Sequence, residues 1–72
     1  MKDPKTKIKE AIAEFLPLYD VTTTSDLQGV CEARAMRILR EVYPDFNPIT
    51  DVLDVMTVSD QILEGIYDAQ RI

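Results

Sequence analysis

The chain has 72 residues and a formal net charge of -5 at pH 7, and 46% of its residues are hydrophobic, which is enough apolar material for a core. This length corresponds to one small domain near the lower limit for independent folding, so we expect residues 1–72 to form a single helical domain. One cysteine and no histidine are present, which excludes an internal disulfide, a cysteine-based zinc site and catalytic pairs of serine or cysteine with histidine. No apolar run approaches the roughly 20 residues needed to cross a bilayer, and no apolar signal segment follows the basic N-terminus. These features predict a cytoplasmic protein.

Residues 3–16 are predicted to form the first helix. Asp3 suits the N-cap position and Pro4 the first helical position, while Pro17 disfavours continuation. The apolar residues between them repeat with helical spacing, at Ile8, Ala11, Ile12, Phe15 and Leu16. In the connection that follows, three side chains are expected to lie against the core: Leu18, Tyr19 and Val21.

Residues 25–43 are predicted to form the second helix, which we expect to be central. Ser25 and Gln28 have the spacing of a capping box, and Pro44 ends the helix. One face is apolar and consists of Leu27, Cys31, Ala35, Ile38 and Val42. The opposite face combines small residues with a methionine, which is unusual for a helix that only caps a core. Either this helix lies between two others or its second face binds another protein; the candidate interface is Gly29, Ala33, Met36, Arg40 and Tyr43.

Residues 44–72 are predicted to contain a turn, a short helix near residues 50–56 and a further helix at residues 59–70. Two prolines flank the turn and disfavour helix at the residues before them. Phe46, between these prolines, is the expected anchor of the turn on the core.

One continuous helix in this region is disfavoured for two reasons. Asp60 would fall on its apolar face, and the segment 55–58 is rich in β-branched residues. Ser59 followed by Asp60 instead resembles a new helix N-terminus. A strand over residues 52–58 is the weaker alternative. The apolar face in question consists of Ile49, Val52, Leu53, Met56, Leu63 and Tyr67.

Together these elements predict an all-α fold, a small bundle of three main helices plus a short extra helix. Gly65 lies inside the last helix, where glycine costs about 1 kcal/mol relative to alanine; close approach of another backbone and simple tolerance both remain explanations. The predicted core consists of Ile8, Ile12, Phe15, Leu27, Cys31, Ile38, Val42, Leu53, Leu63, Ile66 and Tyr67.

No set of residues indicates catalysis, cofactor binding or metal binding, so we expect a protein that is not an enzyme. Cys31 lies on the apolar face of the second helix, which indicates a buried structural thiol. The carboxylate pairs Asp51/Asp54 and Glu64/Asp68 lie where the helical projection predicts solvent. The segment from Asp51 to Asp54 also lacks the ligand spacing and turn glycine of a calcium loop.

The expected function is therefore that of a non-catalytic protein-interaction or regulatory module, whose partner is another protein or a second copy of itself. A membrane or a small-molecule substrate is not implied. The alternative is a small nucleic-acid-associated regulator, because residues 1–9 carry four lysines against one aspartate and three arginines form an oblique row on the second helix. The overall negative charge weakens that alternative. Its candidate phosphate contacts, which could equally meet an acidic partner, are Lys2, Lys5, Lys7, Lys9, Arg34, Arg37 and Arg40.

Overall fold

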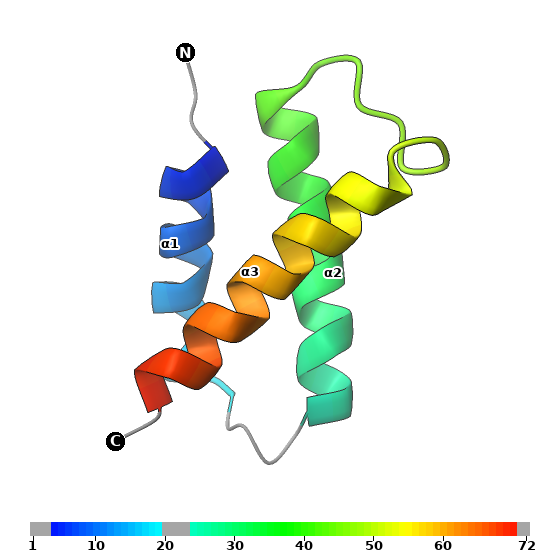
Figure 1. Cartoon of the computed structure of the whole chain (residues 1–72). Coiled ribbons are helices and arrows are strands. Elements are labelled where there is room, and N and C mark those ends of the chain that lie inside the picture. Colours follow the sequence, from blue (N-terminus) through cyan, green and yellow to red (C-terminus); the bar gives the residue numbers. More distant parts are fainter. Residues whose placement is uncertain (1–3, 20–23, 71–72) are drawn as a thin grey trace.

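The computed structural model describes residues 4–19 and 24–70, and folds them into three helices with no strand among them (Figure 1). These helices are α1 (Pro4–Phe15), α2 (Thr24–Val42) and α3 (Val52–Gln70). The all-α prediction is confirmed. Four predictions lie outside the described residues: the N-cap Asp3, the core residue Val21, the basic contact Lys2 and the capping side chain of Ser25.

The helix that holds the bundle together is α3. It crosses both other helices and packs most extensively on α2, whereas α1 and α2 contact each other least (Figure 1). The second helix, which we expected to be central, therefore lies on one side of the bundle. Only one of its faces is covered.

The turn after α1 separates two neighbouring side chains. The backbone N–H groups of Leu18 and Tyr19 both donate to the Phe15 carbonyl, at 3.0 Å each. Tyr19 packs edge-on against the Phe15 ring, with 5.7 Å between ring centroids, and is half-buried as predicted. Leu18 is 66% exposed, so its predicted burial is wrong. A turn this tight directs one of two adjacent side chains inward and the other outward.

A single apolar core lies under the three helices. Phe46 packs against its edge, as predicted for the turn between α2 and α3. Cys31 is fully buried with a free thiol, and burial raises the pKa of that thiol, with a further contribution from Glu32. The buried residues are Ile8, Ala11, Phe15, Leu27, Cys31, Ala35, Ile38, Leu39, Val55, Val58, Ile62 and Ile66. Among the predicted core residues, Ile12, Val42 and Leu63 are half-buried and pack against its edge, whereas Tyr67 is half-buried but does not pack against it.

Residues 52–70 form one helix, so the predicted break between a short helix at 50–56 and a second at 59–70 is wrong. The face of α3 that meets the core carries Val55, Val58, Ser59, Ile62 and Ile66. Asp60 lies off that face and is exposed. The β-branched run is tolerated because its helix penalty is only a few tenths of a kcal/mol per residue, and burial of its valines outweighs that.

The N-terminal part of the predicted apolar face of this region is instead on the outside. Leu53, which we expected in the core, is 74% exposed, and Val52 and Met56 are about half-exposed. α3 carries apolar residues on two sides, and counting them cannot tell which side faces the core.

The start of α3 is fixed by local hydrogen bonds. The Asp51 carbonyl accepts from the N–H groups of Asp54 and Val55, at 3.1 and 3.2 Å. The Asp51 carboxylate accepts from the Asn47 N–H at 3.0 Å, and the Asn47 side-chain oxygen accepts from the Ile49 N–H at 2.9 Å. The bond between Asn47 and Ile49 closes an Asx turn. Such a turn competes with helix and keeps residues 47–49 out of α3, which begins at Val52.

Candidate functional site

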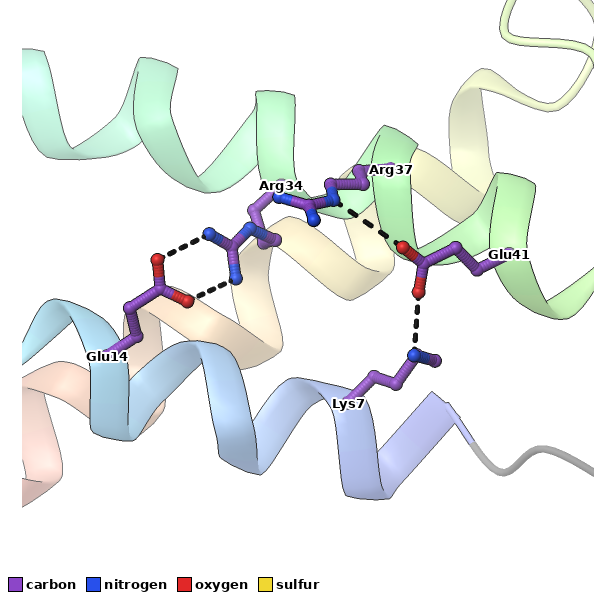
Figure 2. Close-up of polar contacts among 5 residues, drawn as sticks. All are labelled: Lys7, Glu14, Arg34, Arg37 and Glu41. Carbon is purple, nitrogen blue, oxygen red and sulfur yellow. Dashed lines mark hydrogen bonds and ion pairs between the residues drawn. The ribbon is translucent and has the colours of Figure 1, made fainter.

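Three of the seven predicted phosphate contacts lie together between α1 and α2, where carboxylates engage them (Figure 2). Arg34 donates two hydrogen bonds of 2.8 Å to the Glu14 carboxylate. Glu41 pairs with Lys7 at 2.6 Å and with Arg37 at 3.5 Å. The pair of Arg37 and Glu41 joins two residues one turn apart on α2.

Arg34 contacts two residues of α1 through its guanidinium group. Besides its two bonds to Glu14, its guanidinium lies over the Phe15 ring, 4.8 Å from the centroid, in cation–π geometry. Its hydrogen bonds to Glu14 raise the pKa of Arg34 and lower that of Glu14. The side chain is only 19% exposed, so Arg34 joins α1 to α2 and does not present its charge to a phosphate.

These ion pairs predict an acid-dependent loss of stability. Hydrogen bonds from Arg34 and from Lys7 hold the pKa values of Glu14 and Glu41 below the ordinary value of 4.5. A carboxyl whose pKa is lower in the folded state stabilises the fold above its unfolded pKa, and this contribution is lost as the pH falls through the folded pKa. We expect the melting temperature to decline below about pH 4.5, and the decline to be shallower in Glu14→Gln/Glu41→Gln.

The check is thermal unfolding by circular dichroism between about pH 7 and pH 3, a range that begins above the ordinary glutamate pKa and extends below it. The effect is small because both carboxylates are solvent-exposed. Glu32→Gln/Glu64→Gln removes the same charge from exposed residues that make no ion pair within the described part of the chain. An identical change of slope in this control would contradict the assignment to the α1–α2 pairs.

Three other basic residues in the described part of the chain do not line the hollow around these ion pairs. Lys5, Lys9 and Arg40 are exposed. The hollow around the ion pairs has a volume of about 290 Å³ and mixes three basic side chains with three glutamates: Lys7, Arg34 and Arg37 with Glu10, Glu14 and Glu41. Its balance of charge is unfavourable for a phosphate group.

The predicted interface on α2 is open to solvent along most of its length. Gly29, Ala33 and Arg40 are exposed, and Tyr43, just after the end of α2, is 52% exposed. A Cβ at Gly29 would have no neighbour within 4 Å. Met36 is half-buried against the core. This face therefore presents small residues and one arginine to solvent. Met36 on the same face is half-buried, so the first large apolar side chain that is exposed there is Tyr43.

A second surface, which sequence reasoning missed, lies where α2 ends and α3 begins. Within the described residues six large hydrophobic side chains are exposed, and only Leu18 lies elsewhere in the chain. We call the other five the junction surface: Tyr43, Ile49, Val52, Leu53 and Met56. The signal in the sequence was the apolar content of α3 on more than one side, which indicates a helix with a second contact.

An open groove adjoins the junction surface. It has a volume of about 350 Å³ and lies between the start of α1, the end of α2 and the first turns of α3. Tyr43 belongs to the junction surface and also lines the groove, so the two adjoin. We call this hollow the acidic groove; its lining is Pro4, Leu39, Tyr43, Asp45, Phe46, Asp51, Asp54, Thr57 and Val58.

The described residues contain no group of three or more histidine, cysteine, aspartate or glutamate side chains that could hold a metal ion. In the same part of the chain, each helix is too short or too polar to cross a membrane. Comparison with protein-family models, with curated proteins and with solved structures found no match for this chain.

Proposed function

We propose that this chain is a non-catalytic protein-interaction module that binds through the junction surface. One observation supports the proposal: five exposed large hydrophobic side chains are concentrated within residues 43–56. Single exposed apolar residues are common on any protein, whereas a group of them indicates a surface that is covered by a partner.

The size of the junction surface is consistent with a moderate affinity. Complete burial of one large apolar side chain contributes about 1.5–3 kcal/mol, and a dissociation constant of 1 μM corresponds to about -8 kcal/mol. Association itself costs several kcal/mol. Burial of the five side chains together is therefore of the order needed for a micromolar complex, with another protein or with a second copy of the chain, in a cytoplasmic setting.

Site-specific photo-crosslinking in the native cell tests this proposal. The photoreactive residue p-benzoylphenylalanine is placed at Ile49 or Leu53, both strongly exposed on the junction surface. Matched positions are Ala13 on α1 and Glu32 on α2, which are also exposed. We expect discrete crosslinked protein products from Ile49 and Leu53 and none from the matched positions. The reason is that the probe crosslinks only to a protein that is bound next to it.

A fifth position separates the two candidate surfaces. Ala33 reports on the predicted interface of α2, where it is exposed. Products from Ala33 alone would move the binding surface to α2 and contradict the junction surface. Equal labelling at all five positions, or none at any, would overturn the proposal.

A further inference from the structure

The acidic groove combines an apolar floor with a rim of one charge. Leu39, Phe46 and Val58 supply apolar lining from α2, the connecting turn and α3. Its carboxylates come from Asp45, Asp51 and Asp54, and no lysine or arginine lines it among the residues that the structure describes. At about 350 Å³ the groove is at the small end of ligand sites, a size that suits a few anchoring side chains of a longer segment.

Two of the three rim carboxylates have no partner among the described residues. Asp51 accepts a hydrogen bond from the Asn47 N–H and so stabilises the turn before α3. No ion pair or side-chain hydrogen bond is seen to Asp45 or Asp54 within residues 4–19 and 24–70. The charge of the Asp54 carboxylate is also stabilised by the α3 dipole, because Asp54 lies in the first turn of that helix. Asp45 lies outside α3, so the dipole does not account for its charge.

The segment of chain around the groove is negatively charged, as the groove rim is. Residues 44–72 carry six acidic residues against one arginine. A carboxylate-rimmed apolar site attracts a segment with complementary charge and excludes acidic ones. An amphipathic helix laid into a groove presents apolar anchors on one face and lysine or arginine at its flanks.

A second copy of this chain does not supply such a segment. Its most basic helix is α1, and the apolar stripe of that helix, Ile8, Ala11 and Phe15, is already buried in its own core. The open face of α2 carries Arg40, and its one large exposed apolar side chain within the described residues, Tyr43, is itself part of the groove lining. The groove therefore fits a different protein.

We infer that the acidic groove binds a lysine- or arginine-rich amphipathic helical segment of a partner protein, with apolar side chains in the groove and basic ones on Asp45 and Asp54. This assignment rests on the proposed interaction function and names the class of its partner.

The test is an NMR titration of the isotope-labelled full chain with synthetic helical peptides of about four turns, roughly 14 residues. One peptide carries leucine on one face and lysine on the other, and its matched counterpart carries glutamate in place of lysine. At low ionic strength we expect the lysine peptide to bind saturably and to shift the amide signals of Tyr43, Phe46 and Thr57. The glutamate peptide is expected not to bind.

Two charge variants distinguish binding in the groove from nonspecific electrostatic attraction of the lysine peptide to the acidic chain. Asp45→Asn/Asp54→Asn is expected to weaken binding of the lysine peptide at least about tenfold at low salt. Asp60→Asn/Glu64→Gln removes the same charge from exposed positions on α3 outside the groove, and is expected to change binding much less. Tyr43→Ala, which removes apolar lining, is expected to weaken binding as well.

Several results would overturn the inference: no binding of the lysine peptide, equal binding of the glutamate peptide, equal loss in the two charge variants, or signal changes confined to the open face of α2. Crosslinked products at Ile49 and Leu53 together with any of these results would leave the interaction function standing and reject only the basic helical partner. A product consisting of two copies of this chain would also reject that partner. Absence of crosslinks at those positions would reject the interaction function itself.

Discussion

Replacement of Ile62 with alanine is expected to lower the free energy of unfolding by about 3–4 kcal/mol. Ile62 is fully buried on the inner face of α3, in the core that all three helices share. Truncation removes apolar contacts and leaves a cavity that neighbouring side chains fill only in part. A single core of this size rarely supplies more than about 3–5 kcal/mol in total, so the variant is expected to be largely unfolded at room temperature.

The matched control is Leu53→Ala on the same helix. Leu53 is 74% exposed, and its truncation is expected to change stability by no more than about 0.5 kcal/mol. Urea unfolding followed by far-UV circular dichroism at low protein concentration measures both variants as monomers. A large loss in Leu53→Ala and a small one in Ile62→Ala would mean that the apolar face expected from the sequence is the true core face of α3.

Replacement of Gly65 with valine is expected to destabilise the protein by about 2 kcal/mol. A Cβ at this position would overlap the end of the Ile12 side chain and lie 3.0 Å from its Cγ1. The added methyl groups of valine have room only if the Ile12 side chain changes rotamer or α1 and α3 move apart. Close approach of another backbone, one of the two explanations for a glycine in this helix, is not what the structure shows: the group that approaches Gly65 is the Ile12 side chain of α1.

Gly29→Val is the matched control because both glycines lie inside helices. A Cβ at Gly29 would meet open space, and valine is a better helix former than glycine by a few tenths of a kcal/mol. This variant is therefore expected to be slightly stabilised. Thermal or urea unfolding of both variants measures the difference.

A double-mutant cycle identifies the clashing partner. Ile12→Ala removes the side chain that occupies the space at Gly65, so the double variant is expected to be more stable than the two single losses add up to, by about 1 kcal/mol or more. Simple additivity would show that the loss in Gly65→Val has another origin.

The candidate sites were predicted from the sequence only in part. The helical projection placed Gly29, Ala33 and Arg40 on a face opposite the core, and they are exposed. The helical projection could not predict the ion pair of Arg34 with Glu14, which lies twenty residues away along the chain. Ion pairs between helices depend on the angle at which the helices pack. The acidic groove was likewise out of reach, since its lining comes from all three helices and the turn before α3.

The sequence by itself determined the all-α class, the buried thiol of Cys31 and the extents of α1 and α2. These follow from local rules, namely helical periodicity and proline positions, that act within one segment. Only the tertiary structure decided the rest: that α3 is one helix, that Val55 and not Leu53 faces the core, and that the junction surface stays exposed. α3 is apolar on two sides, so its local pattern allows either side to face inward. The choice between them comes from the burial energy of the whole bundle, in which Ile62 and Ile66 are fully covered by the other two helices.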